Sequence, residues 1–186
     1  MPVPARPGAT VWLTGLPGAG TSGIAAELAA RIRAEGHRAE VLDGDEIDAG
    51  LPAGPGSSRA DRDARVRRVG MVAEVLARNG VIVLVPDRAP GRDARDGVRL
   101  RHDLARVPYL EVHVAAPVAA RAAREAGGLP TRRAAGAPAG AAGVTGVAGD
   151  PYEPPDCPDL RLETHRRTPA ESADAVHALL TERGLL

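Results

Sequence analysis

A glycine-rich loop between an apolar strand and a helix places the strongest constraint on the fold of this chain. Residues Thr10–Thr14 (TVWLT) are predicted to form a short strand, and the run Gly15–Ser22 (GLPGAGTS) follows at once. The run matches the phosphate-loop pattern G-x-x-x-x-G-K-[ST] except that Thr21 replaces the lysine. In such loops, backbone N–H groups and a helix N-terminus hold a phosphate. The loop therefore predicts a nucleotide phosphate site that lacks one charge.

The composition narrows the classes of protein to which the chain can belong. Its 186 residues favour one domain, residues 1–186, with a sizeable core. The formal net charge is zero and all 24 basic residues are arginine, so we expect neither a nucleic-acid nor a membrane-surface partner. The single cysteine, Cys157, and the lack of an apolar run of about 18 residues favour the cytoplasm.

Apolar runs and helical patterns alternate along the chain, which favours an α/β fold with a mostly parallel sheet and helices on both faces. Strands are expected at Thr10–Thr14, Ala39–Leu42, Val81–Val85, Leu110–Val114 and Leu160–Leu162. Helices are expected at Ser22–Ala34, Asp61–Arg78, Arg92–Leu104, Pro117–Glu125 and Pro169–Leu180. Leu51–Ser58 is predicted to be a loop. The Ala- and Gly-rich segment Gly127–Gly149 is expected to be either a mobile lid or a disordered loop.

Each signal also has a purely structural interpretation. The glycine spacing fits a tight strand-to-helix turn, although its place between a buried strand and a helix favours phosphate binding. The run Asp43–Asp45 (DGD) fits either carboxylates near a reacting hydroxyl or a solvated turn. The arginines of residues 61–68 and Arg92 fit either an anion site or an exposed helix face.

Five strings in order along the chain resemble those of the adenylylsulfate (APS) kinases, with the match running from about Thr10 to Glu171. They are TVWLTGLPGAG, LDGD, DRDARVRR, GLPTRR and TGVAGDPYE. The resemblance implies a P-loop kinase-like three-layer sandwich with a mostly parallel sheet and a lid segment at about residues 127–150. It also implies transfer of the γ-phosphate of ATP, with Mg²⁺, to the 3′-hydroxyl of adenylyl sulfate. Members are usually dimers, so a homodimer is expected.

The resemblance assigns roles to residues at matching positions. The implied nucleotide contacts are Gly15, Gly18, Ala19, Gly20, Thr21 and Ser22, with the Ser22 hydroxyl also expected to bind Mg²⁺. Two carboxylates, Asp43 and Asp45, are the implied catalytic groups. The implied contacts of the acceptor substrate are Arg62, Arg65, Pro90, Arg92, Thr145 and Gly146.

Departures from the family pattern occur on both sides of the implied site. On the ATP side, Thr21 replaces the lysine. On the adenylyl sulfate side, Asp48 replaces an arginine, and Ser57 and Val144 replace the two phenylalanines that enclose adenine in the family. Five further positions differ, with Arg65 for asparagine, Ala89 for serine, Gly91 for tyrosine, Gly127 for lysine and Pro130 for tyrosine.

Three functions are compatible with this mixture of retained and replaced residues. The leading hypothesis is a degenerate member with reduced or lost kinase activity and residual nucleotide binding that acts as a non-catalytic partner or regulator, for example of an active paralogue. The second is an active kinase or nucleotide-handling enzyme with a different small-molecule acceptor. The third is an ordinary APS kinase of sulfate assimilation.

Overall fold

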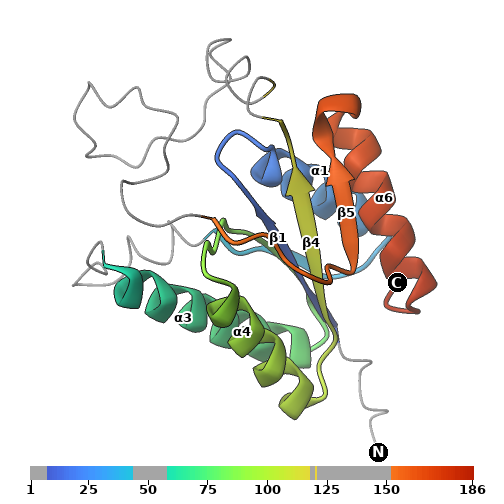
Figure 1. The fold of residues 1–186 in the computed structure, drawn as a ribbon. Coiled ribbons are helices and arrows are strands. Elements are labelled where there is room, and N and C mark those ends of the chain that lie inside the picture. Colours follow the sequence, from blue (N-terminus) through green and yellow to red (C-terminus); the bar gives the residue numbers. More distant parts are fainter. Residues whose placement is uncertain (1–7, 44–57, 118–119, 121–151) are drawn as a thin grey trace, which may run out of the picture.

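Five parallel strands form one sheet at the centre of the structure, a computed structural model that describes residues 8–43, 58–117, 120 and 152–186 (Figure 1). In spatial order the strands run β2-β3-β1-β4-β5. Their bounds are β1 Ala9–Gly15, β2 Ala39–Val41, β3 Ile82–Pro86, β4 Tyr109–Ala115 and β5 Leu160–Glu163. Because all are parallel, their carboxyl ends lie at one edge, where ligands bind in open α/β sheets.

Helices cover both faces of the sheet (Figure 1). Helices α1 (Thr21–Ala34) and α6 (Pro169–Glu182) pack on one face, and α3 (Arg59–Arg78) and α4 (Arg92–Ala105) pack on the other. A short 3₁₀ helix, η1 (Thr164–Arg166), follows β5 directly. The described residues therefore form a three-layer α/β sandwich.

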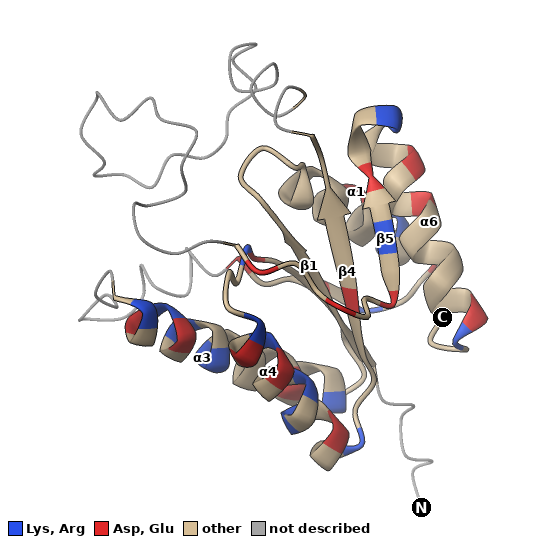
Figure 2. Cartoon of the chain, in the orientation of Figure 1, with Lys and Arg blue, Asp and Glu red and all other residues tan. Residues whose placement is uncertain are grey.

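Alternate side chains of β1 point to opposite faces of the sheet and so contribute to two apolar cores, one under each helical layer. Val11 and Leu13 are fully buried against the α1–α6 layer, whereas Trp12 is fully buried against the α3–α4 layer. Every residue of β1 is buried, as expected of a central parallel strand covered on both faces. Charged residues are concentrated on the helices, most densely on α3 and α4 (Figure 2).

The predicted architecture is confirmed where the structure describes the chain. Each of the five expected strands is present, and four of the five expected helices agree with the observed bounds to within two residues. Most of Leu51–Ser58, most of Pro117–Glu125 and the whole segment 127–150 lie outside the described residues. Within those residues, no helix is long and apolar enough to cross a bilayer.

His102 connects α4 to β1 inside the α3–α4 layer and is fully buried. Its Nδ1 lies 2.8 Å from the Val98 carbonyl oxygen, which can only accept, so Nδ1 carries the proton. Its Nε2, 2.9 Å from Thr10 Oγ1, then accepts from that hydroxyl. Burial is the largest cause of the lowered pKa of His102, and this shift favours the neutral ring.

We predict that the free energy of unfolding falls by about 1 kcal/mol between pH 7.5 and pH 5.5. Below the ordinary histidine pKa of about 6.5, the unfolded chain takes up a proton that folded His102 resists, so stability present above that pH is lost as the pH falls. Urea unfolding at the two pH values measures the change. His102→Gln should reduce the dependence to the part that the buried His113 contributes, whereas His165→Gln, at an exposed position, should leave it intact. Equal slopes in all three proteins would contradict the assignment.

Candidate functional site

The glycine-rich loop leaves β1 and turns directly into α1. Gly18 and Gly20 have φ angles of 76° and 101°, in the left-handed region that favours glycine. The Ala19 N–H donates to the Leu16 carbonyl oxygen over 3.0 Å, which closes a tight turn. A Cβ on Gly15 would lie 2.4 Å from the Val114 carbonyl oxygen, so only glycine allows β1 to approach β4 this closely.

The N-terminus of α1 is suited to an anion. Its N-cap is Gly20, which provides no side-chain cap, and its first turn holds no acidic residue. The first backbone N–H groups of a helix have no partner within the helix, and the helix dipole favours negative charge there. Thr21 begins α1 and is half-buried, and the exposed Ser22 follows. The predicted loop residues therefore lie together at the uncapped N-terminus of α1.

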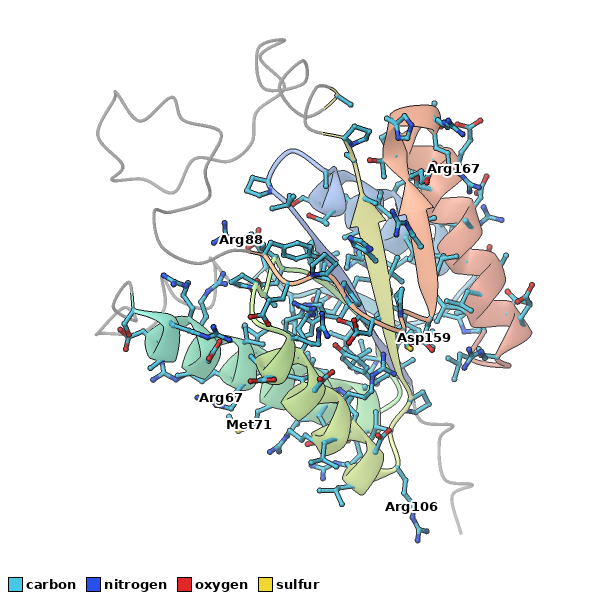
Figure 3. All side chains as sticks on the ribbon, viewed as in Figure 1. Arg67, Met71, Arg88, Arg106, Asp159 and Arg167 are labelled. Carbon is cyan, nitrogen blue, oxygen red and sulfur yellow. The ribbon has the colours of Figure 1, made fainter. Side chains whose placement is uncertain are left out.

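The end of β1 is fixed to the loop between β3 and α4. Thr14 Oγ1 donates to the Arg88 carbonyl oxygen over 2.6 Å. Because that hydroxyl hydrogen is used, the Tyr152 hydroxyl, 3.2 Å away, donates to Thr14 Oγ1. Arg88 lies at the carboxyl edge of the sheet (Figure 3). The contacts place residues 87–92 beside the start of the glycine-rich loop.

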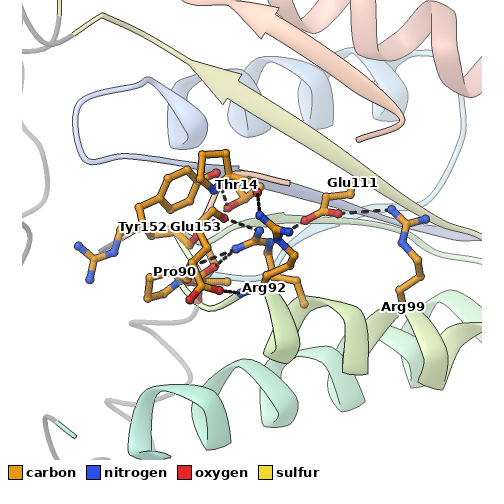
Figure 4. A network of polar contacts seen from close by, with 12 residues as sticks. Thr14, Pro90, Arg92, Arg99, Glu111, Tyr152 and Glu153 are labelled. Carbon is orange, nitrogen blue, oxygen red and sulfur yellow. Dashed lines mark hydrogen bonds and ion pairs between the residues drawn. The ribbon is translucent and has the colours of Figure 1, made fainter. Parts of the chain in front are cut away.

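A buried arginine, Arg95, organises this edge, and Figure 4 shows its partners Glu111 and Glu153. Arg95 of α4 donates from Nε to Glu111 Oε1 over 2.6 Å. Its two other nitrogens donate to the carbonyl oxygens of Ala89, at 2.5 Å, and Glu153, at 2.7 Å. The side chains of Arg95 and Glu111 are 1% and 6% exposed, so this ion pair is almost fully shielded from water. Through these hydrogen bonds, Arg95 of α4 connects β4, the β3–α4 loop and the segment at Glu153.

Glu153 caps α4 from a distant part of the chain. The N-cap residue Gly91 has no side chain to cap the helix; instead, Glu153 Oε2 accepts from the Arg92 N–H over 2.7 Å. That N–H is the largest cause of the lowered pKa of Glu153. Oε1 accepts from Arg59 Nη2 of α3 over 3.3 Å. The carboxylate thus links the starts of two helices.

Two of the three arginines expected at the acceptor side, Arg65 and Arg92, are engaged by carboxylates of the chain itself. Arg65 Nη1 lies 2.7 Å from Asp87 Oδ2, and the Asp87 side chain is 3% exposed. The other oxygen of Asp87 accepts from the N–H of Ala89, which has a left-handed φ of 38°. Arg92 pairs with Asp156 and donates to the Pro154 carbonyl oxygen over 3.1 Å. Carboxylates of this chain therefore pair with arginines that an anionic acceptor would contact.

The structure brings together many of the predicted site residues. The glycine-rich loop, Pro90 and Arg92 lie at the carboxyl edge, and Arg62 and Arg65 lie on the first half of α3. Asp43 follows β2 at the same edge, separated from β1 by β3. Asp45, Thr145 and Gly146 lie outside the described residues.

Sequence reasoning did not identify Arg95, Glu111 or Glu153 as organisers of the edge. One signal was available, because Glu111 interrupts the apolar run of β4 and Arg95 lies on the α4 face that carries Ala94 and Val98. Two charges on faces that must be buried indicate an ion pair. Their pairing across 16 residues required the fold.

A cavity of about 290 Å³ adjoins the glycine-rich loop at the ends of β4 and β5. Leu16, His113, Tyr152 and Arg161 are among the residues that line it. Burial is the largest cause of the lowered pKa of His113, which favours the neutral ring. An aromatic ring, a neutral imidazole and a guanidinium beside a phosphate-type loop suit a planar polar group such as a nucleotide base.

The residues at this edge are compatible with Mg²⁺ bound together with a nucleotide. Mg²⁺ keeps several waters and takes one or two carboxylates plus substrate phosphates rather than a dedicated protein cage. Ser22 supplies a hydroxyl and Asp43 a carboxylate at the carboxyl edge. No cluster of three or more His, Cys, Asp or Glu suited to a metal occurs in the described residues.

The strand order and the loop after β1 place the chain among the α/β proteins with a P-loop kinase fold. The family model described as adenylylsulphate kinase matches residues 7–163, so the chain belongs to the adenylylsulphate kinase family. An adenylyl-sulfate kinase of Microcystis aeruginosa is 42% identical over 179 residues, which cover 96% of this chain and 94% of that protein.

Two solved structures of the family resemble this one. The APS kinase of Mycobacterium tuberculosis in complex with AMPPNP and APS has a TM-score of 0.82 and 37% identity, covering 94% of this chain and 98% of that chain. A hexameric APS kinase from Thiobacillus denitrificans has a TM-score of 0.71 and 31% identity, covering 100% of this chain and 31% of that chain.

Proposed function

We propose that this chain binds MgATP and adenylyl sulfate at the carboxyl edge of its sheet and that Thr21 strongly slows phosphoryl transfer between them. The observation that carries the proposal is a loop with left-handed glycines and an uncapped helix N-terminus whose charged position holds an uncharged threonine. The relative from M. tuberculosis was solved with AMPPNP and APS, which supports the same pair of ligands here.

The proposed reaction assigns separate roles to the metal ligand, the catalytic carboxylate and the contacts of the acceptor. Bound Mg²⁺ would neutralise charge on the β- and γ-phosphates, with Ser22 as a ligand. Asp43 or Asp45 would orient the 3′-hydroxyl and accept its proton as the oxygen attacks the γ-phosphorus and ADP leaves. The proposed contacts of adenylyl sulfate remain Arg62, Arg65, Pro90, Arg92, Thr145 and Gly146.

The expected loss at Thr21 is large. A charge-assisted hydrogen bond contributes about 1.5–3 kcal/mol to binding, and removal of one donor to the transition state costs roughly 10²–10³ in rate. Loss of two aromatic stacks, at Ser57 and Val144, costs about 1–3 kcal/mol each. We therefore infer weak nucleotide binding with reduced or lost kinase activity.

A second candidate is transfer to a different small-molecule acceptor. The contacts that favour it are the pairs Arg65–Asp87 and Arg92–Asp156, which neutralise cations on the acceptor side. A less anionic acceptor needs fewer free cations, because charged substrates are held by charge-assisted bonds. Nucleotide binding at the loop is common to both candidates.

We also propose a homodimer in the cytoplasm, with an active paralogue as the alternative partner. The large apolar side chains exposed in the described residues are those of Met71 and Val75 on α3 and Leu100 and Leu104 on α4. Met71 is exposed on α3 (Figure 3), along which residues of both charge signs alternate (Figure 2). A second copy related by a two-fold axis would cover the apolar side chains and pair opposite charges.

Thr21→Lys should strengthen ATP binding by about 10- to 100-fold, because it restores one charge-assisted bond to phosphate. It should also raise the rate of 3′-phosphoadenylyl sulfate formation by roughly 10²-fold. Calorimetry with MgATP and a coupled ADP assay measure the two effects. Thr21→Gln, which has a longer side chain and no charge, is the control and should show neither gain. Wild-type turnover equal to that of Thr21→Lys would contradict a slowed kinase.

Thermal shifts separate the two candidate acceptors. Under the leading proposal, adenylyl sulfate raises the melting temperature on its own and further with ADP, because a ligand that binds only the folded state stabilises it. ATP and ADP raise it under both candidates. A shift with nucleotides and none with adenylyl sulfate at millimolar concentration would favour the different acceptor. The absence of any nucleotide shift would contradict both candidates.

The proposed dimer predicts a mass twice that of the 19.1 kDa chain in size-exclusion chromatography with light scattering. Leu100→Glu/Leu104→Glu should yield monomer, since it places charges in the proposed apolar contact. Ala30→Glu, at an exposed position on α1, is the matched control and should stay dimeric. A monomeric wild type at tens of micromolar would contradict the dimer.

A further inference from the structure

Thr164 reaches the glycine-rich loop from the far end of the chain. It begins η1 directly after β5, and its Oγ1 donates to the Ala19 carbonyl oxygen over 2.8 Å. The two residues are 145 positions apart in sequence, and they are 3% and 1% exposed. The hydrogen bond is therefore shielded from water. Loss of the Thr164 hydroxyl would leave the Ala19 carbonyl oxygen without a hydrogen-bond donor, because water cannot reach it.

Strand register explains why these residues meet. Gly15 of β1 and Leu162 of β5 both pair with Val114 of β4, so the loop and η1 start at the same level on either side of β4 (Figure 1). A Cβ built on Gly15 would lie 3.3 Å from the Ala19 methyl carbon. The loop thus folds back over the end of β1, which brings Ala19 to Thr164.

The hydrogen bond fixes the direction of one peptide group. In a trans peptide the C=O and the following N–H point in opposite directions, and the described residues contain no cis peptide. With the Ala19 carbonyl held toward Thr164, the Gly20 N–H points away from η1. The Gly20 N–H donates to no residue of the described ranges, whereas the Ala19 N–H donates to the Leu16 carbonyl oxygen.

We propose that Thr164 is a positioning residue that holds the Ala19–Gly20 peptide with its N–H available to a nucleotide phosphate. Glycine on either side of Ala19 gives this peptide unusual freedom to flip, and a flipped peptide would present a carbonyl oxygen to the anion. The bond matters more here because Thr21 brings no charge, so uncharged donors, the backbone N–H groups and the hydroxyls of Thr21 and Ser22, must hold the phosphate. The inference rests on the proposed nucleotide site.

Thr164→Val and Thr164→Ser test the role, because valine keeps the shape without the hydroxyl and serine keeps the hydroxyl. Thr164→Val should weaken AMPPNP binding by about 10-fold in calorimetry, and Thr164→Ser should bind within about 2-fold of wild type. Adenylyl sulfate affinity should not change in either. Thr181→Val, which removes a hydroxyl bonded to the His177 carbonyl on α6, is the matched control.

Hydrogen exchange on the protein without ligand gives a readout that does not depend on nucleotide binding. Thr164→Val should raise exchange about 10-fold in peptides covering residues 15–22 and leave β1, β4 and α6 as in wild type. Wild-type exchange in those peptides, or equal loss of both ligands, would overturn the positioning role and leave a structural one. If wild type itself fails to bind AMPPNP, the proposed function fails, while the exchange experiment still decides whether Thr164 orders the loop. If Thr164→Val does not fold, Thr164→Ala replaces it in both measurements.

Discussion

The parallel pairing of β1 with two neighbours is the constraint on which the rest of the structure depends. Leu13 pairs with Pro86 of β3, and Gly15 pairs with Val114 of β4. Val114 also pairs with Leu162 of β5, so the parallel strands β3, β1, β4 and β5 all end at one edge of the sheet, where the glycine-rich loop, the β3–α4 loop and η1 meet. The buried faces of β1 hold this arrangement through apolar packing, so the positions of the polar groups follow from the core.

All basic residues of this chain are arginine, and several of them make contacts that a lysine could not make. Arg95 donates from three nitrogens to groups on β4, the β3–α4 loop and the segment at Glu153. A guanidinium presents its donors in a fixed fork, whereas an ammonium is a compact point charge. Arg65 and Arg92 likewise form ion pairs, with Asp87 and Asp156. Neutralised arginines and an uncharged Thr21 together define a site with less positive charge than its motif implies.

The fold could be predicted from the sequence because its signals are local. The apolar runs of β1 and β3, the helical spacing in α1 and the glycines between β1 and α1 each follow from neighbouring residues. Contacts between distant segments could not be predicted in this way. Nothing near Glu153 indicates that it caps α4, since its partner, the Arg92 N–H, lies 61 residues away. The same holds for the bond from Thr164 to Ala19, which joins opposite ends of the chain.

The sequence by itself determined the α/β class, the family and the location of the phosphate-type loop, because periodicity, glycine and motif order are properties of short segments. It also identified Thr21 as the departure that most affects the chemistry. Only the tertiary structure decided which cations remain for a ligand and what orients the loop. Burial and strand register set those partners, and a side chain such as Arg65 meets Asp87 only after the sheet has brought α3 and the end of β3 together.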